Sequence, residues 1–393
     1  MSRLHDTLHP ALPEDAATAA FAGRVWLPAV GGPAVVSVRD ETIIDITATY
    51  PTMRDLCEAP DPAAAMRAAT GPALPALRDI LDNTPPETRD PGKPWLLAPV
   101  DLQAIKAAGV TFAVSMLERV IEERARGNPA AAAEIRAEVR RLIGDDLGKL
   151  KPGSAEADEL KKVLMAQGAW SQYLEVGIGP DAEIFTKAPP MSAVGTGMDG
   201  GVHPKSSWNN PEPEIVLVVA SSGAIVGATL GNDINLRDVE GRSALLLGKA
   251  KDNTASAAIG PFIRFFDARY TLDTVRTSTV SLRVEGEDQF VVEGASSIAK
   301  ISRDPADLVA QMIGPHHQYP DGAVLYLGTM YAPVQDRGAP GSGFTHKTGD
   351  IVTVSAPGLG RLVNRMTPTD RCEPWAFGAG ALMRNLARRG LLG

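Results

Sequence analysis

The chain has 393 residues, of which 44% are hydrophobic and 22% charged, an ordinary balance for a globular protein. Its 39 Lys and Arg against 47 Asp and Glu give a net charge of −8, so a nucleic-acid partner is not expected. No apolar run reaches the ~18 residues that cross a bilayer, and residues 1–13 lack a signal-peptide pattern. The sequence therefore predicts a cytoplasmic protein with no membrane partner.

The N-terminal part contains two kinds of sequence. Residues 22–48 hold short β-rich runs broken by Gly-Gly-Pro and by Arg39-Asp40, which predicts strand, turn and strand. Residues 59–97 are rich in Pro and Gly, typical of loop and linker, with a short helix expected near 74–82. We therefore expect a small N-terminal domain over 1–97 that ends in a Pro-rich linker, followed by a catalytic domain over 98–393.

Residues 113–168 show the three- and four-residue spacing of apolar side chains that predicts helices. Gly127-Asn128-Pro129 separates the first two helices, and Ser154 is a candidate N-cap for the third. The charged residues of the first helix, with Glu118 and Arg119 among them, indicate a solvated helix face. This helical insertion is either a lid or simply packed against the core, and the sequence leaves both open.

Strand-like runs dominate after residue 170. Residues 214–220 and 224–231 are β-branched runs joined by Ser221-Ser222-Gly223, which predicts a hairpin. Further runs of this kind lie at 279–286, 289–294, 323–328 and 350–366. Many strands and few helices predict a mixed α+β fold, mostly β, with a largely antiparallel core that is closed or folded on itself.

Three carboxylates gather around the predicted hairpin. Glu212 and Glu214 lie two residues apart where the first strand begins, so their side chains point to the same side of the chain. Asp233 ends the partner strand, and the hairpin therefore brings all three to one end. Oxygen ligands with no His or Cys nearby suit Mg²⁺, Mn²⁺ or Ca²⁺ rather than Zn²⁺. Three solvated carboxylates near a turn remain the alternative at this point.

Further motifs follow the three carboxylates in a fixed order. Lys251 precedes an Ile-Gly-Pro-Phe segment at 259–262, a Gly-Thr turn lies at 327–330, and FTHKTGD at 344–350 leads into IVTVSAPGLGRLVN. With these motifs in this order, the chain resembles the catalytic domain of the fumarylacetoacetate hydrolase superfamily over residues 98–366. That resemblance implies a β-rich catalytic fold and a Mg²⁺ cofactor, for which Mn²⁺ is a substitute.

A narrower resemblance covers nearly the whole chain. The segments AAGVTFAVSMLERVIEERARG, SWNNPEPEIVL, GNDINLRDVEGRSALLLGKAKDN and FTHKTGD are similar to those of bacterial 2-keto-3-deoxy-D-xylonate dehydratases. This likeness implies Mg²⁺-dependent dehydration of a 2-keto-3-deoxy sugar acid to 2,5-dioxopentanoate in oxidative pentose catabolism, by a homodimer or a higher homo-oligomer. The alternatives are an acylpyruvate hydrolase, an oxaloacetate decarboxylase, or a 2-oxo acid binding protein without turnover. The configuration preferred at C4 stays open.

The resemblance also implies roles for individual residues. Glu212, Glu214 and Asp233 match the metal ligands of the superfamily. Lys251 matches a residue that contacts the keto or carboxylate oxygen of the substrate, although a salt bridge to a carboxylate of the site is the alternative. Thr329, together with the backbone N–H of Gly328, matches the element that binds the carboxylate of a 2-oxo acid.

Three further positions match segments that approach the substrate in the superfamily. Arg237 matches a residue near the substrate, and a salt bridge to Asp238 or Glu240 is the alternative. Glu183 and Lys187 belong to AEIFTKAP, a segment that the resemblance places beside the substrate.

One departure from the superfamily pattern bears on the reaction. Hydrolytic and decarboxylating relatives often carry Tyr-x-x-His-x-x-Glu, whereas this chain has Ser115 at the His position and retains Glu118. Serine is a poor base for activating water, so the change disfavours hydrolysis and suits a dehydratase. Glu118 is then the expected catalytic base, with an exposed charge on the helix surface as the alternative.

Overall fold

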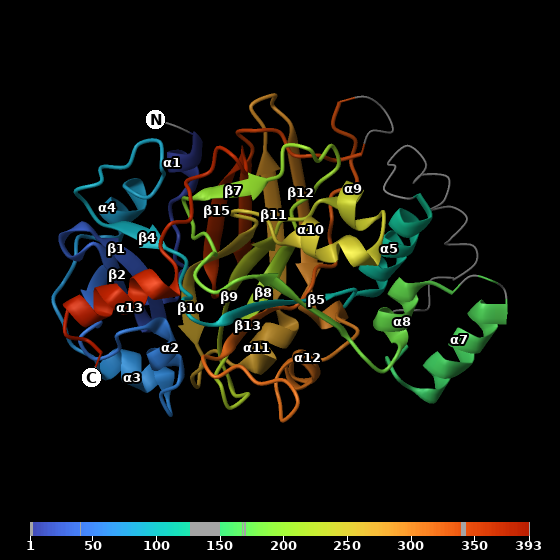
Figure 1. The fold of residues 1–393 in the computed structure, drawn as a ribbon, viewed down its shortest axis with the longest axis horizontal. Helices are drawn as coiled ribbons and strands as arrows, with labels where there is room; N and C mark the ends of the chain where they lie inside the picture. Colours follow the sequence, from blue (N-terminus) through green and yellow to red (C-terminus); the bar gives the residue numbers. More distant parts are fainter. Residues whose placement is uncertain are drawn as a thin grey trace.

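The architecture comes from a computed structural model that describes residues 3–39, 41–125, 150–166, 168, 170–338 and 343–392. Within these residues, ten strands form one sheet and five form a second, which confirms the predicted mixed fold with mostly strands. The helices of the described part are too short or too polar to cross a membrane. Figure 1 shows the two sheets at the centre of the molecule.

The larger sheet contains the predicted hairpin and the N-terminal strands. Its strands run in the order β3-β2-β1-β10-β9-β8-β13-β5-β6, and β4 pairs with β1. Their bounds are Thr42–Asp45 (β3), Gly32–Arg39 (β2), Phe21–Leu27 (β1), Ala257–Phe265 (β10), Ile225–Asp233 (β9), Pro213–Val219 (β8), Ala323–Tyr326 (β13), Ala104–Gly109 (β5), Glu183–Ala188 (β6) and Trp95–Leu97 (β4). Most neighbours are antiparallel, and β13 with β5 is a parallel pair.

The smaller sheet packs on the larger one. Its order is β12-β11-β14-β15-β7, with bounds Val291–Ser297, Thr279–Glu285, Ile351–Ala356, Gly360–Pro368 and Asp199–Val202. Between the sheets, Leu217 of β8 shares one apolar cluster with Leu282 and Val354 of the smaller sheet. The alternate β8 residue Val218 joins a second cluster with Leu56, beneath the helices on the other face. Burial on both faces explains why β8 is apolar without interruption from Ile215 to Val219.

The helices lie around the sheets rather than between them (Figure 1). Those on the N-terminal side are α1 (Arg3–Thr7), α2 (Met53–Cys57), α3 (Pro62–Ala68) and α4 (Leu77–Asp82), joined there by α13 (Ala379–Arg388). Short helices near the middle are α9 (Arg237–Glu240), α10 (Leu247–Lys251), α11 (Leu272–Thr277) and α12 (Pro305–Met312). The insertion at the opposite end contains α5 (Ala113–Ala125), α7 (Ala155–Ala166) and α8 (Gln172–Ile178).

The predicted helical insertion is confirmed in its first and third helices. Ser154 accepts a hydrogen bond from the backbone N–H of Ala157 at 3.2 Å, as an N-cap does. The expected second helix, from about 130 to 145, lies outside the described residues. Arg303 from the core donates to the carbonyl oxygens of Val176 at 2.9 Å and Gly179 at 2.7 Å, which fixes the end of α8 to the main body.

The boundary expected at residue 97 does not separate two sheets. Phe21 of β1 pairs with Arg264 of β10, so the N-terminal strands extend the sheet that holds the hairpin. The chain also returns to this region at its end, since Asn385 of α13 donates to the carbonyl oxygens of Val30 and Gly31. The division into 1–97 and 98–393 therefore stays a prediction about sequence organisation, across which one sheet is continuous.

Candidate metal and active site

The three predicted carboxylates meet at one end of the β8–β9 hairpin. The strands pair Pro213 with Asn232 and Glu214 with Gly231, which sets Asp233 beside Glu212. Oxygen atoms of Glu212, Glu214 and Asp233 all lie within 4.8 Å of one another. The three residues are only 4%, 2% and 2% exposed, which rules out the alternative of solvated carboxylates near a turn.

Two lysines bind the cluster from the side of the protein core. Lys251 Nζ donates to Glu212 Oε2 at 2.5 Å and to Asp233 Oδ2 at 2.8 Å, so the salt bridge considered from the sequence is present. Lys187 Nζ lies 2.8 Å from Asp233 Oδ1 and donates to the carbonyl oxygen of Ile234 at 3.0 Å. Lys187 is fully buried and does not line the site cavity, so the structure does not place it at the cavity wall, and its contact with substrate stays a prediction. Lys187 holds Asp233 in place.

The carboxylates differ in how readily they hold a proton. Burial alone would raise the pKa of Glu212, but the positive charges of Lys251 and Arg119 lower it to about 2. Burial raises the pKa of Glu214 well above its usual value, and the negative charges of Asp233 and Glu212 raise it further. Burial opposes the charge on Lys251, yet Asp233 and Glu212 keep its pKa above the usual value. The cluster therefore carries more negative charge than its neighbours balance easily.

A small cavity opens directly on the cluster. Its volume is about 30 Å³, which holds a metal ion or one or two waters but not a five-carbon acid. The lining residues are Ala108, Gly109, Val110, Arg119, Glu183, Phe185, Glu212, Glu214, Asp233, Glu240, Lys251, Gly328 and Thr329. Entry of a substrate must therefore displace some of these side chains.

Glu183 enters the cavity because a glycine makes room for it. It pairs across the sheet with Gly109, where a Cβ atom would lie 2.2 Å from Glu183 Oε2. Burial and the nearby charge of Glu240 raise the pKa of Glu183 to about 7. A carboxyl group with such a pKa exchanges protons readily near neutral pH, as general acid–base catalysis requires.

The glycine turn predicted to bind the substrate carboxylate does line the cavity. Gly328 has φ of 88°, a conformation that favours glycine, and its backbone N–H donates to Glu214 Oε2 at 2.6 Å. The Thr329 hydroxyl donates to the carbonyl oxygen of Tyr331 at 3.0 Å. Both groups are thus engaged within the protein, and the turn fixes the metal-site carboxylate Glu214.

Two other predicted residues lie beside the cavity rather than in it. The Arg237 guanidinium stacks on the Trp208 ring at 4.6 Å and donates to the carbonyl oxygen of Pro333. Glu118 Oε2 lies 3.9 Å from Arg237 Nη2, and neither residue lines the cavity. The side chain of Ser115 lies outside the described part of the chain, so its role stays a prediction.

The structure brings in residues that the sequence did not indicate. The Arg119 side chain is only 13% exposed and pairs with Glu212 and Glu240, so its assignment to a solvated helix face is wrong. Asn235 donates to both of these carboxylates, at 3.2 and 2.6 Å. The helical spacing of α5 could not find Arg119, because nothing in that spacing shows which charged residue faces a distant strand.

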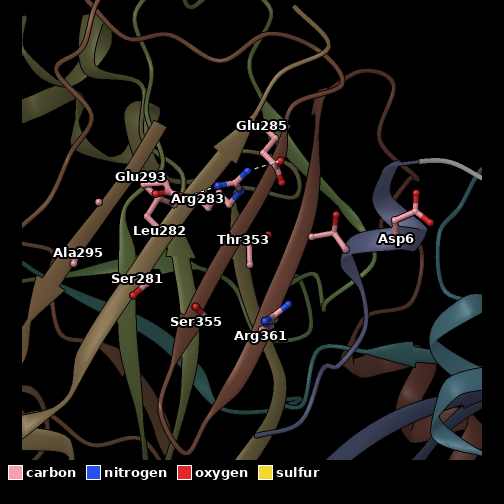
Figure 2. Close-up of a pocket in the computed structure, with 12 residues that line it drawn as sticks. Asp6, Ser281, Leu282, Arg283, Glu285, Glu293, Ala295, Thr353, Ser355 and Arg361 are labelled. Carbon is pink, nitrogen blue, oxygen red and sulfur yellow. Dashed lines mark hydrogen bonds and ion pairs between the residues drawn. The ribbon is translucent and has the colours of Figure 1, made fainter. Parts of the chain in front are cut away.

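A much larger concavity lies elsewhere. It measures about 710 Å³ and lies on the open face of the smaller sheet, with none of the predicted residues in its lining. Figure 2 shows Arg283 between Glu285 and Glu293 on this face, and Arg283 donates to Glu285 at 2.9 Å. These charges are exposed and paired with one another, so we assign the chemistry to the small cavity.

The site lies within a segment that matches a known family. A model described as "Fumarylacetoacetate (FAA) hydrolase C-terminal" matches residues 180–367. This range holds the three carboxylates, Lys251 and the Gly328 turn, and it excludes α5.

Two curated relatives align with about half of the chain. A 2-dehydro-3-deoxy-D-arabinonate dehydratase of Saccharolobus solfataricus is 32% identical over 184 residues, which cover 46% of this chain and 57% of that protein. A "Probable 2-keto-3-deoxyxylonate dehydratase" of Haloferax volcanii is 30% identical over 195 residues, covering 50% and 63%. The chain thus spans less than two thirds of the length of either relative.

The similarity in fold covers more of the chain than these sequence alignments do. The solved structure of a 2-keto-3-deoxy-D-arabinonate dehydratase complexed with magnesium and 2,5-dioxopentanoate superposes with a TM-score of 0.61, at 20% identity. The match covers 89% of this chain and 98% of that one, so the two share the fold over nearly their whole length. Residues 180–367 thus match the fumarylacetoacetate hydrolase family model, and the chain shares its fold with that dehydratase.

Proposed function

We propose that the protein catalyses the Mg²⁺-dependent dehydration of 2-keto-3-deoxy-D-xylonate to 2,5-dioxopentanoate in oxidative pentose catabolism. The observation that carries this proposal is the buried cluster of Glu212, Glu214 and Asp233 with Lys251, which opens on a cavity. The names of the curated relatives, both dehydratases of 2-keto-3-deoxypentonates, support the same reaction class.

The donor set fits a hard divalent ion. All three candidate ligands offer carboxylate oxygens, the ligands that Mg²⁺ prefers and that Mn²⁺ also accepts. Burial raises the pKa of Glu214, and the negative charges of Asp233 and Glu212 raise it further, a repulsion that a divalent cation would relieve. Bound there, Mg²⁺ supplies a Lewis acid that stabilises negative charge on the C2 oxygen of a 2-oxo acid.

Glu183 is our candidate for moving the protons. It lines the cavity, and its pKa of about 7 lets its carboxylate take the C3 proton of the substrate and its acid form protonate the departing C4 hydroxyl. Loss of that hydroxyl as water leaves a C3=C4 double bond. Proton movement from C5 to C3 then gives the C4=C5 enol, and transfer of the enol O–H proton to C4 leaves the aldehyde at C5. Lys251 would hold the charge that develops on the C2 oxygen.

Glu118, the base expected from the sequence, remains the competing candidate. Its Oε2 lies 3.9 Å from Arg237 Nη2, and neither side chain lines the cavity. Comparison of Glu118→Gln with Glu183→Gln separates the two. The variant that loses the chemical step while it still binds Mg²⁺ identifies the group that transfers the proton.

The test of the reaction is turnover of 2-keto-3-deoxy-D-xylonate, coupled to an NADP-dependent dehydrogenase of 2,5-dioxopentanoate. We expect NADPH formation with Mg²⁺ and none with EDTA. The D-arabinonate-derived isomer, run in parallel, reports the preference at C4. Release of pyruvate from acylpyruvates or oxaloacetate, without NADPH formation from either pentonate, would replace the dehydratase with a hydrolase or decarboxylase.

We also propose a homodimer or a higher homo-oligomer that acts on small molecules alone. This expectation comes from the resemblance to the superfamily. Light scattering on the purified protein would measure the mass in solution, and a mass equal to one chain would contradict the proposal.

A further inference from the structure

A cation from the helical insertion reaches the carboxylate cluster. Arg119 of α5 donates through Nη2 to Glu212 Oε1 at 2.7 Å, and its Nη1 lies 2.5 Å from Glu240 Oε2. Its guanidinium lines the cavity although α5 lies outside the segment that matches the family. The insertion therefore contributes a charged group to the site.

The two partners of Arg119 differ in kind. Glu240 ends α9, is 4% exposed, and accepts a hydrogen bond from Asn235 at 2.6 Å, so its carboxylate is fixed. Glu212 is a candidate metal ligand, and an ion bound to it would share its negative charge and weaken its hold on Arg119. A guanidinium has five N–H donors in a planar fork, so Arg119 can exchange Glu212 for another anion while Glu240 keeps its position.

The other candidates for binding a substrate anion are engaged elsewhere. Lys251 bonds two carboxylates of the cluster, and Lys187 lies behind the cluster with no exposed surface. The backbone N–H of Gly328 already donates to Glu214. Arg119 and Lys251 both line the cavity and both pair with a candidate metal ligand, but Arg119 is also held by Glu240, which lies outside the three metal-site carboxylates.

We propose that Arg119 binds the carboxylate of the 2-oxo acid substrate and that Glu240 positions it. This inference rests on the proposed function and deepens it, because it makes the helical insertion part of substrate recognition. A substrate that ligates an ion held by Glu212 must lie beside Arg119. Bidentate pairing of guanidinium with carboxylate supplies the geometry that fixes such an acid.

Calorimetric binding to the whole protein tests the role without turnover. The probes are Mg²⁺ alone, then pyruvate and its neutral analogue pyruvamide in saturating Mg²⁺. For Arg119→Gln we expect pyruvate to bind at least about tenfold more weakly than to the wild type, as loss of a charge-assisted hydrogen bond predicts. Pyruvamide and Mg²⁺ should change by less than about threefold.

Controls distinguish this role from others. Arg384→Gln removes one positive charge from exposed α13 and should leave all three affinities unchanged. Arg119→Lys keeps the charge without the planar fork and should give an intermediate loss of pyruvate affinity. Because no turnover is measured, the expected pattern would stand even if the protein failed to dehydrate either pentonate.

Three outcomes would overturn the inference. An equal loss of pyruvate and pyruvamide would mean that Arg119 does not recognise the carboxylate. A loss of Mg²⁺ affinity as large as that of pyruvate would make Arg119 an orienting group for Glu212 only. Unchanged pyruvate binding in Arg119→Gln would remove it from the site altogether.

Discussion

Two hollows of this molecule are lined by charged residues and differ in almost everything else. The concavity on the smaller sheet measures about 710 Å³, and its residues Arg283 and Glu293 are 44% and 65% exposed in their side chains. The cavity at the β8–β9 hairpin measures about 30 Å³, and its carboxylates are almost fully buried. Water screens the first set of charges and is largely excluded from the second.

This difference teaches that size is a poor guide to chemistry. Exposed ion pairs gain little, because solvent already satisfies both partners. Buried like charges cost free energy unless lysines, arginines or a cation offset them, so a protein retains them where they have a use. Substitutions at the buried site should therefore have larger effects than substitutions of the exposed charges on the smaller sheet.

The largest effect is expected from Asp233→Asn. Asp233 bonds Lys251 and pairs with Lys187, both at 2.8 Å, so its loss leaves the buried Lys187 without its carboxylate partner and Lys251 with Glu212 alone. Unfolding of the metal-free protein should need roughly 3–5 kcal/mol less free energy, as measured by urea denaturation. Glu293→Gln on the open sheet is the matched control. If both variants lost the same free energy of unfolding, buried and exposed charges would contribute equally to stability, which would contradict the comparison of the two cavities.

The next effect concerns catalysis. Glu183→Gln should lower turnover by about 10²–10⁴-fold, the usual contribution of general acid–base catalysis, while calorimetry finds Mg²⁺ affinity little changed. Gly109→Ala should resemble it, since the added methyl would lie 2.2 Å from Glu183 Oε2 and displace the carboxylate. Wild-type turnover in Glu183→Gln would return the role to Glu118.

The stability of the metal-free protein should depend on pH through Glu183. Its pKa is raised from 4.5 to about 7, so the folded state favours the protonated form. The stability that this proton gives is complete below pH 4.5 and is lost as the pH rises through 7, by about 3 kcal/mol. Urea denaturation with EDTA at pH 5 and pH 8 should show this loss in the wild type and not in Glu183→Gln. If the wild type and Glu183→Gln lost the same stability between these pH values, the pH dependence would belong to other titratable groups.

A smaller loss of stability is expected from substitution of Arg303, a buried cation that donates to backbone carbonyl oxygens rather than to carboxylates. Arg303 is 5% exposed and donates to the carbonyl oxygens of Val176 and Gly179. Arg303→Ala should cost about 2 kcal/mol and should speed hydrogen exchange in α8 more than in β8. Uniform exchange changes across the chain would mean that Arg303 does not anchor the insertion in particular.

The smallest effect belongs to the open sheet. Arg283→Gln breaks the exposed pairs with Glu285 and Glu293, and the free energy of unfolding should change by no more than about 0.5 kcal/mol. Differential scanning calorimetry at low and moderate salt would measure it. A loss of unfolding free energy as large as that of Asp233→Asn would show that solvent and salt do not screen these surface ion pairs.

Local pattern determined much of this protein from its sequence. The β-branched runs predicted the hairpin that is now β8 and β9, and Ser154 marked the start of α7. The period of two along a strand put Glu212 and Glu214 on the same side, and Asp233 followed from the hairpin. Each of these features depends on neighbours in sequence or on one short turn, which periodicity and turn chemistry describe.

Tertiary packing decided how the surrounding residues act. Lys187 was expected beside the substrate and lies behind Asp233, while Arg119 was expected in solvent and lies at the cavity wall. A gap of 93 residues separates Arg119 from Glu212, and 74 separate Glu183 from the Gly109 that makes room for it. Helical or strand period shows which residues share a face, but not what that face meets. The contact itself depends on how distant elements pack, so only the folded structure reveals it.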